Sequence, residues 1–363
     1  MNDKKNVLMI IDSPMDNAGV QNVVMSIIRS LHSKYNFDVL ACSLKEGYFD
    51  KEIEKFGGVV YRTDLIRYEG NKLSYLKRIR QLRSATIKCL ESNKYDIIHC
   101  NNGVDAGTCL KVAYDFGIAV RINHSHGHYT FNTKNPILKV YYDKGLKWSN
   151  KYATLRLACS NIAGKSLFGE KEFFNILNPI DYTYFSSIKR VEHDNINLMQ
   201  IGYYYDNKNQ LFSLSVLKEL LDQKKKVHLF FIGYALDETY YHKMVSYINS
   251  LKLNDNVTFL DSDYQKNMVL GEIDYMLIPS RSEGLSLVAL ESQAAGIPVL
   301  CSDAIPRDVD FGACIYPSNN ISNWVAAINN NIQAPFHISK ELQKLDISFY
   351  AQKIDKLYLQ GLN

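Results

Sequence analysis

The sequence predicts an α/β fold built from two doubly wound parallel sheets. Apolar strand-like segments alternate with amphipathic helical segments in two successive series along the 363 residues, and such alternation is typical of parallel sheets covered by helices. A polar run over 186–197 separates the two series. A chain of this length exceeds one ordinary hydrophobic core. We therefore predict a first domain over 1–185, a second over 196–340 and a helical tail over 341–363.

Each element follows from local pattern. In the first half, apolar runs predict strands at 7–11, 37–41, 58–61, 95–99, 119–124, 158–160 and 174–177, and helical spacing predicts helices at 20–31, 71–92 and 104–116. In the second half the same criteria predict strands at 198–202, 227–233, 257–260, 275–279 and 299–301, and helices at 210–221, 237–251 and 287–295. Gly296 and Pro298 end the last of these helices before the next strand. The tail over 340–363 also has helical spacing.

Composition indicates a globular protein of a reducing compartment. Apolar residues make up 46% and charged residues 22%, and no apolar run reaches the length of a membrane span. The N-terminus lacks the apolar core of a signal peptide, which favours a cytoplasmic location. The seven cysteines are scattered without a C-x-x-C pair, which argues for reduced thiols and against a disulfide framework or a zinc site.

The charge is unevenly distributed. Residues 1–190 carry 28 basic and 18 acidic residues, whereas 191–363 carry 14 and 20. The first half is therefore net basic and the second net acidic, so an anionic partner is expected at the first half only.

Two glutamates form the most informative motif. Glu283 lies at a predicted strand-to-helix turn, and Glu291 lies eight residues later, about 12 Å along a helix. The helix N-terminus between them favours phosphate. Glu291 shares the predicted inward stripe with Leu287 and Ala295, where a carboxylate must be paired or must bind a polar group. The alternative is a capping acid followed by an ion-paired acid.

The segment resembles the E-x7-E signature of retaining GT-B glycosyltransferases of family 4. The flanking sequences Ser282-Glu283-Gly284 and Glu291-Ser292-Gln293-Ala294-Ala295-Gly296 match this signature, and the likeness is denser over 195–310 than over 1–180. The resemblance implies two Rossmann-like domains facing across a cleft. The first would bind the acceptor and the second the nucleotide-sugar, and the last helix would return to the first domain.

The resemblance also implies roles for single residues. It implies that Glu291 binds the ribose and that Glu283 binds the donor sugar. The backbone of the four residues after Glu283 would bind the sugar and the diphosphate; these are Gly284, Leu285, Ser286 and Leu287. Lys208 matches the lysine that binds the donor diphosphate. Tyr203 stands where the family has an arginine; a tyrosine donates one hydrogen bond but no positive charge. A solvated loop lysine is the alternative for Lys208.

Residues of the first domain complete the implied site. The family has a histidine at the end of one strand, facing donor sugar and diphosphate; His126 matches it best and His124 second, while His99 is as well explained by a structural role. Ligands in doubly wound folds bind at the carboxyl ends of strands, where these histidines lie. Gly19 matches the family's glycine-rich turn near the diphosphate, although it could be only a turn residue.

No metal is expected. Asp261-Ser262-Asp263 and Asp308-Val309-Asp310 both have the D-x-D pattern that binds metal in a different glycosyltransferase fold, but GT-B enzymes need no such ion. By resemblance, Asp261 and Ser262 lie near the nucleobase. The alternating histidines 124, 126 and 128 have no acidic partner in sequence.

A basic amphipathic segment suggests a membrane surface. Residues 71–90 contain no acid and six basic residues, namely Lys72, Lys77, Arg78, Arg80, Arg83 and Lys88. Such a helix can lie on anionic lipid, and many relatives use lipid-linked acceptors. The alternative is a helix packed on the core with a solvated basic face.

These observations predict an enzyme that moves a hexose or N-acetylhexosamine from a nucleotide-sugar to a sugar hydroxyl. The resemblance implies that the donor is a UDP-sugar, that the configuration is retained and that the enzyme acts in surface polysaccharide synthesis. Lys208, Glu283 and His126 are the expected catalytic residues. An accessory GT-B subunit without catalysis is one alternative, because Tyr203 replaces the arginine. A nucleotide-sugar epimerase is another. A nucleic-acid binder is disfavoured by the acidic second half.

Overall fold

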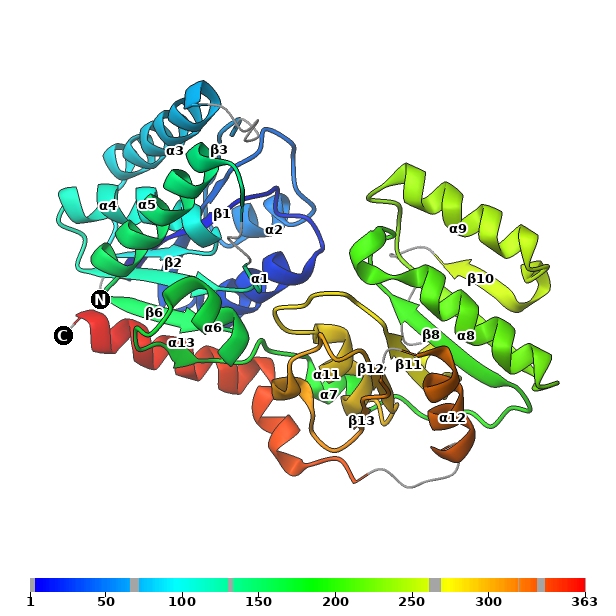
Figure 1. The fold of residues 1–363 in the computed structure, drawn as a ribbon. Helices are drawn as coiled ribbons and strands as arrows, with labels where there is room; N and C mark the ends of the chain where they lie inside the picture. Colours follow the sequence, from blue (N-terminus) through cyan, green and yellow to red (C-terminus); the bar gives the residue numbers. More distant parts are fainter. Residues whose placement is uncertain are drawn as a thin grey trace. The chain divides into compact units, whose positions relative to one another are not determined.

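The computed structural model describes residues 4–65, 72–129, 133–260, 269–318, 320–331 and 337–362. The chain forms two compact units (Figure 1). The first unit comprises residues 1–179 and 347–363, and the second comprises 180–346. Each is a parallel sheet with helices on both faces, as predicted.

The first unit is built on a parallel sheet in the order β3-β2-β1-β4-β5-β6-β7. Its strands are β1 (Lys5–Ile11), β2 (Tyr35–Ala41), β3 (Val60–Arg62), β4 (Ile97–Cys100), β5 (Val120–Ser125), β6 (Leu155–Ala158) and β7 (Phe174–Asn175). The order reverses between β1 and β4, so the loops that follow these two strands diverge. Ligands bind at such a switch point in doubly wound folds.

Helices cover both faces of this sheet. They are α1 (Gly19–Leu31), α2 (Asp50–Lys55), α3 (Lys72–Ser92), α4 (Ala106–Asp115), α5 (Pro136–Tyr152), α6 (Asn161–Phe168) and α13 (Ile347–Leu362). Helix α1 packs beside α13, and α4 packs beside both α3 and α5 (Figure 1). No helix was predicted over 136–152.

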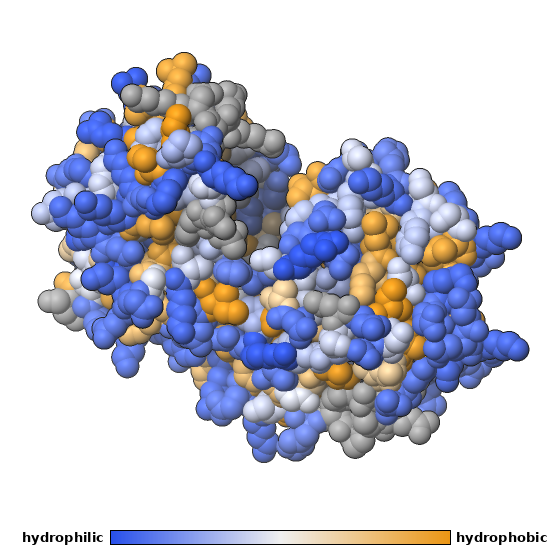
Figure 2. Space-filling view, in the orientation of Figure 1, coloured by the Kyte–Doolittle hydropathy of each residue, from blue (hydrophilic) through white to orange (hydrophobic). Residues whose placement is uncertain are grey.

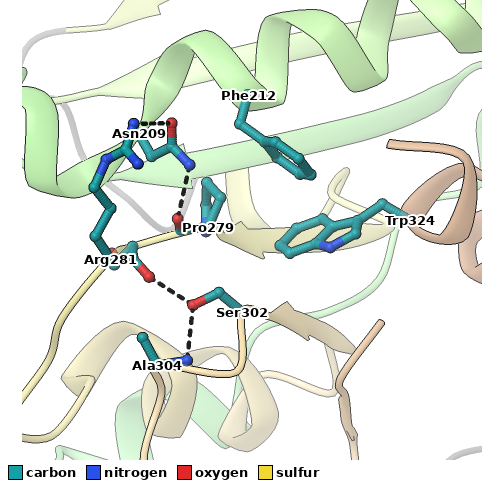
Figure 3. Close-up of a pocket in the computed structure, with 8 residues that line it drawn as sticks. Asn209, Phe212, Pro279, Arg281, Ser302, Ala304 and Trp324 are labelled. Carbon is teal, nitrogen blue, oxygen red and sulfur yellow. Dashed lines mark hydrogen bonds between the residues drawn. The ribbon is translucent and has the colours of Figure 1, made fainter. Parts of the chain in front are cut away.

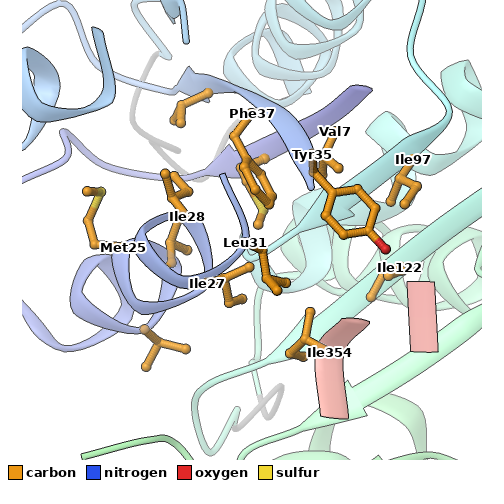
Figure 4. Packing of buried hydrophobic residues seen from close by; sticks show 14 of the residues in the cluster. Val7, Met25, Ile27, Ile28, Leu31, Tyr35, Phe37, Ile97, Ile122 and Ile354 are labelled. Atoms are coloured by element: carbon orange, nitrogen blue, oxygen red, sulfur yellow. The ribbon is translucent and has the colours of Figure 1, made fainter. Parts of the chain in front are cut away.

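Strand β1 is apolar on both faces because both are buried. Val7, Met9 and Ile11 join the cluster formed with α1 and α13 (Figure 4). Leu8 and Ile10 join the opposite cluster with α3 and α4. Since side chains alternate across a strand, a continuous apolar run is required where helices lie on each side.

The C-terminal segment is divided into two parts. A single helix was predicted over 340–363, but a 3₁₀ turn at Lys340–Leu345 is separated from α13 by Asp346, whose backbone is extended. Helix α13 buries a stripe at helical spacing against α1: Tyr350, Ala351, Ile354, Leu357 and Tyr358. The tail thereby completes the core of the first unit.

The second unit contains a parallel sheet in the order β10-β9-β8-β11-β12-β13. Its strands are β8 (Ile196–Ile201), β9 (Val227–Ile232), β10 (Val257–Leu260), β11 (Tyr275–Ile278), β12 (Val299–Cys301) and β13 (Cys314–Ile315). Its helices are α7 (Tyr182–Ser186), α8 (Gln210–Asp222), α9 (Glu238–Ser250), α11 (Leu287–Ala294) and α12 (Ile321–Asn331). The order reverses between β8 and β11.

The boundary between the units differs slightly from the prediction. We expected residues up to 185 in the first domain, but 180–185 belong to the second unit. Helix α7 packs against α11 there, and Phe185 is buried. Residues 341–346 likewise belong to the second unit, because Ile180 donates its backbone N–H to the Leu345 carbonyl.

The position of Ile354 in Figure 4 leads to a stability prediction. Its side chain is fully buried among strand and helix residues of the first unit, so Ile354→Ala should lower the free energy of unfolding by about 2–5 kcal/mol. Lys353→Ala on the exposed face of the same helix should change it by less than about 0.5 kcal/mol. Urea unfolding measures both. Equal effects would contradict the packing of α13.

Candidate active site

The two glutamates lie at the carboxyl end of β11 in the second unit. Glu283 is in the loop after the strand, and Glu291 is in the second turn of α11. Ser286 caps this helix by accepting a hydrogen bond from the Ala289 N–H at 3.4 Å. The first-turn N–H groups have no partners within the helix, and with the helix dipole they favour an anion.

Glu283 forms an ion pair with Lys208. Lys208 Nζ lies 2.5 Å from Glu283 Oε1, and the two side chains are 21% and 14% exposed. Lys208 follows β8 and Glu283 follows β11, so the pair spans the switch point of the sheet. The lysine crosses Gly202 closely, because a Cβ there would lie 3.2 Å from Lys208 Cε. A partly buried cation is thus held where a ligand binds in such folds.

Three amide side chains hold the loops that carry this pair. Asn207 Nδ2 donates to the Ser282 carbonyl at 2.9 Å, and Asn209 Nδ2 donates to the Pro279 carbonyl at 3.2 Å. Gln200 Nε2 donates to the Lys208 carbonyl at 2.6 Å. Asn209 has a left-handed backbone, with φ of 56°, which asparagine tolerates. The roles of Asn207 and Asn209 were not identified from the sequence, because their partners lie 75 and 70 residues along the chain.

Glu291 lies at the edge of the buried face of α11. The inward residues of this helix are Ala289, Leu290 and Gln293 with their neighbours, whereas Glu291 and Leu287 are partly exposed. The prediction that Glu291 occupies the inward stripe was therefore wrong. Gln293 occupies it instead, and its side chain donates to Val309 and accepts from Phe311. Glu291 is therefore partly exposed at the margin of this face.

Tyr203 packs toward β9. Its ring centroid lies 4.6 Å from that of Tyr234, which follows β9, and its carbonyl accepts from Gln210 Nε2 at 2.9 Å. Where the family has an arginine, this chain therefore has a tyrosine that pairs with another aromatic ring. Both tyrosines directly follow a glycine at the end of a strand, Gly202 after β8 and Gly233 after β9. Lys208 provides a cation at this edge of the sheet.

The first unit brings the three predicted histidines together. His99 is in β4, His124 is in β5 and His126 follows β5. His99 Nε2 lies 3.2 Å from His124 Nδ1, and the rings of His124 and His126 are 4.0 Å apart. Tyr358 of α13 completes the row, its hydroxyl 2.8 Å from His99 Nδ1.

Burial keeps this histidine row neutral. It lowers the pKa of His99 to about 3, with a further contribution from His126, and it lowers the pKa of His126 to about 4. Burial also puts the pKa of His124 well below its usual value, and the neighbouring histidines add to the effect. The row therefore provides oriented hydrogen-bonding groups without positive charge.

Gly19 begins α1, whose preceding residue Ala18 provides no side-chain cap. No heavy atom lies within 4 Å of a Cβ built at Gly19, so packing does not require a glycine here.

Asp261 and Ser262 lie outside the described residues, as does the side chain of Lys72. Among the residues that the structure describes, no group of three or more His, Cys, Asp or Glu could hold a metal ion.

One residue of the predicted basic surface has a different role. Arg78 is 18% exposed and pairs with buried Asp105, whose other oxygen accepts from the Tyr141 hydroxyl. Burial raises the pKa of Asp105, and Arg78 opposes the rise. Arg78 is thus not part of the solvent-facing basic surface, because this ion pair turns it inward. Lys77, Arg80 and Arg83 are exposed on α3.

A separate pocket of about 430 Å³ adjoins the loops of the ion pair in the second unit (Figure 3). Its lining includes the polar residues Asn209, Arg281 and Ser302 and the aromatic residues Phe212 and Trp324. None of the predicted site residues lines it. Arg281 at this pocket is engaged by Asp206, 3.3 Å from its Nε.

Comparison with known proteins covers most of the chain. Residues 184–335 match the model of glycosyl transferases group 1, and residues 17–169 match that of glycosyltransferase family 4. The chain belongs to the group 1, family 4 glycosyltransferases. Its activity is therefore that of a retaining glycosyltransferase, EC 2.4.1.-.

Similar proteins span nearly the full length of this glycosyltransferase. EpsF of Bacillus subtilis is 26% identical, with 90% of this chain and 88% of EpsF covered. The capsular polysaccharide glycosyltransferase CapH of Staphylococcus aureus is 24% identical, with 97% and 98% covered. HepE of Anabaena, solved with UDP and glucose, has a TM-score of 0.75 at 16% identity, with 97% and 98% covered. The glycosyltransferase therefore has the GT-B fold.

The histidine row gives a pH prediction. Unfolded histidine titrates near pH 6.5 and folded His99 near pH 3, so below pH 6.5 only the unfolded chain takes up this proton. Stability from this residue is present above pH 6.5 and falls toward pH 3 by about 1.4 kcal/mol per unit. His99→Asn should remove that dependence.

The measurement is urea unfolding of the native chain and of the His99→Asn chain at pH 7.5 and 5.5. The loss of stability on acidification should be about 1 kcal/mol smaller in the variant. His242→Asn, which removes an exposed histidine of the second unit, is the control. An equal loss in native and His99→Asn chains would contradict a neutral buried His99.

Proposed function

We propose that this protein transfers a hexose or N-acetylhexosamine from a UDP-sugar to a sugar hydroxyl of a glycan or lipid-linked acceptor, with retention, in surface polysaccharide synthesis. The observation that carries the proposal is the Lys208–Glu283 pair beside the N-terminus of the helix that bears Glu291. This arrangement brings a cation from the loop after β8 together with a helix N-terminus and two carboxylates from the segment after β11, at the switch point of the sheet.

The chemistry follows from these charges. As the bond from sugar to diphosphate breaks, negative charge grows on the leaving phosphate, and Lys208 with the N-terminus of α11 stabilises it. Glu283 orients the donor sugar while holding Lys208 in place. Glu291 hydrogen-bonds the ribose hydroxyls, and His126 lies on the sugar-phosphate side. Retention is consistent with attack on the face that the diphosphate leaves.

The relatives support the choice of donor and acceptor. An Escherichia coli protein 22% identical to this chain is named as a galactosyltransferase that uses UDP-Gal and a diphosphoundecaprenol-linked acceptor. HepE is solved with UDP-glucose, and CapH acts in capsular polysaccharide biosynthesis. A UDP-sugar donor and a lipid-linked sugar acceptor therefore fit this chain.

A lipid-linked acceptor would bring the protein to the inner surface of the cell membrane. No described helix is long and apolar enough to cross a bilayer, and the face drawn in Figure 2 is largely hydrophilic. Lys77, Arg80, Arg83 and Lys88 form an exposed stripe along α3, next to Leu73, which is 75% exposed. This basic stripe suits anionic headgroups.

An accessory subunit is the second candidate. Tyr203 favours it, because the tyrosine provides no charge where the family has arginine and its ring packs on Tyr234. Lys208 and the two glutamates favour catalysis. Nucleotide binding separates the two candidates.

Glu291→Ala should weaken UDP binding roughly 10- to 100-fold, because a charge-assisted hydrogen bond contributes about 1.5–3 kcal/mol. Glu283→Gln should leave UDP binding within about threefold and abolish most transfer, since the amide keeps a hydrogen bond to Lys208 but loses the charge facing the sugar. Calorimetry with UDP, GDP and ADP measures binding, and release of UDP from a donor with acceptor measures transfer.

Glu238→Ala, which removes an exposed carboxylate at the start of α9, is the control and should bind UDP like the native chain. Undiminished binding by Glu291→Ala would overturn the ribose assignment. A native chain that binds none of the three nucleotides would favour the accessory candidate, and Tyr203→Arg would then be the next variant.

The basic stripe is tested with vesicles. Reversing Lys77, Arg80 and Arg83 to Glu should weaken binding to vesicles with phosphatidylglycerol about 100-fold or more at low salt, because each basic residue near the surface contributes about 1 kcal/mol. Reversing the exposed Lys225, Lys226 and Lys243 of the second unit changes the net charge equally and is the control. Equal losses, or no binding by the native chain, would refute the membrane role of α3.

A further inference from the structure

His126 is hydrogen-bonded to an amide that the sequence did not single out. Its Nε2 lies 2.8 Å from Oδ1 of Asn101, the residue after β4, and Asn101 is 4% exposed. On its other side Asn101 directs Nδ2 to the backbone carbonyl of His99, at 3.3 Å. One buried amide thus connects two members of the histidine row.

The chemistry of these contacts determines where the proton of His126 lies. A backbone carbonyl can only accept, so the NH₂ end of Asn101 must face His99. The amide oxygen must then face His126, and because that oxygen also only accepts, Nε2 of His126 must carry a hydrogen. In a neutral ring the other nitrogen, Nδ1, is then bare.

A second buried amide lies near the ring. The side chain of Asn178 is 5% exposed and is close enough to His126 to affect its pKa. As placed, Nδ1 of His126 and Oδ1 of Asn178 are buried acceptors without a partner among the described residues. Turning the Asn178 amide by half a rotation, which exchanges two nearly indistinguishable atoms, gives an N–H donor to Nδ1. Both ring nitrogens are then satisfied.

We propose that Asn101 is a positioning residue that holds His126 as the neutral Nε2–H tautomer, with Asn178 donating to Nδ1. His126 then takes part in transfer as an oriented neutral dipole and not as a proton donor. The role in transfer rests on the proposed function, whereas the tautomer does not. Stabilising the negative charge that grows on the leaving phosphate is the role of Lys208 and the N-terminus of α11.

The surroundings agree with a neutral ring. Asn101 and Asn178 do not titrate, and burial keeps the neighbouring histidines 99 and 124 neutral. Burial lowers the pKa of His126 to about 4. Among the described residues, no carboxylate is hydrogen-bonded to the ring, whose partner is Asn101. A ring held in this way keeps one orientation across the neutral pH range.

The tautomer can be measured on the full chain without substrate, from long-range ¹H–¹⁵N NMR spectra of protein labelled with ¹⁵N-histidine. The signals of His126 are assigned as those that disappear in the His126→Gln variant. In the native chain Nε2 should have the shift of a protonated nitrogen and Nδ1 that of a bare one, unchanged from pH 8 to 5.5. Asn101→Leu, close in size but without an acceptor, should give averaged tautomers, because the Asn178 amide can then present either its oxygen or its nitrogen to Nδ1. A native chain with averaged tautomers, or Asn101→Leu with the native pattern, would overturn the proposal.

Asn101→Asp is the conservative variant and keeps the test decisive if the leucine variant does not fold. Its carboxylate still accepts from Nε2 and also stabilises the imidazolium, so His126 should keep the Nε2–H form at pH 8 and gain its second proton at a higher pH than in the native chain. Unchanged titration of His126 in this variant would overturn the contact.

Transfer assays separate this inference from the proposed function. Asn101→Leu should lower kcat at least tenfold with the donor KM within about threefold, and Asn101→Asp should restore most of kcat at pH 8. Loss of the single tautomer without loss of kcat would overturn the positioning role. A native chain that has the single tautomer but transfers no sugar would overturn the proposed function and uphold the tautomer.

Discussion

The ion pair between Lys208 and Glu283 is the interaction on which the candidate site depends. Partial burial of two charges costs solvation, and this cost is offset only because the pair is close and well held. Asn207 and Asn209 hold it by tying the loop after β8 to the loop after β11. In the proposed mechanism the cation is therefore in place before a diphosphate binds, which reduces the reorganisation that transfer requires.

The two units contribute different physical properties. The second unit provides charge, through Lys208, the two glutamates and the N-terminus of α11. The first unit provides neutral hydrogen-bonding groups, because its histidines are buried with Tyr358 and with side-chain amides. Helix α13 connects the end of the chain to this row, so the same packing that stabilises the first core also fixes the orientation of His99.

Several elements were predictable from local pattern. The alternation of strands and helices, the helix that bears Glu291 and the amphipathic tail all follow from residue spacing. Helix α5 was missed, although Asn135 caps it and Pro136 begins it, a known start signal. The sequence wrongly predicted that Glu291 faces inward and that Arg78 faces solvent. The burial of each side chain depends on which neighbouring elements cover that face of its helix.

The two sheets, the eight-residue spacing of Glu283 and Glu291 across a loop and a helix, and the family signature could all be read from the sequence, since they depend on residues close together in the chain. Which residues contact one another over long separations could be seen only in the folded structure. Lys208 meets Glu283 across 75 residues, and Tyr358 meets His99 across 259. Such contacts come from strand order and from the return of the last helix, and hydrophobic spacing alone does not specify which loop will lie beside another.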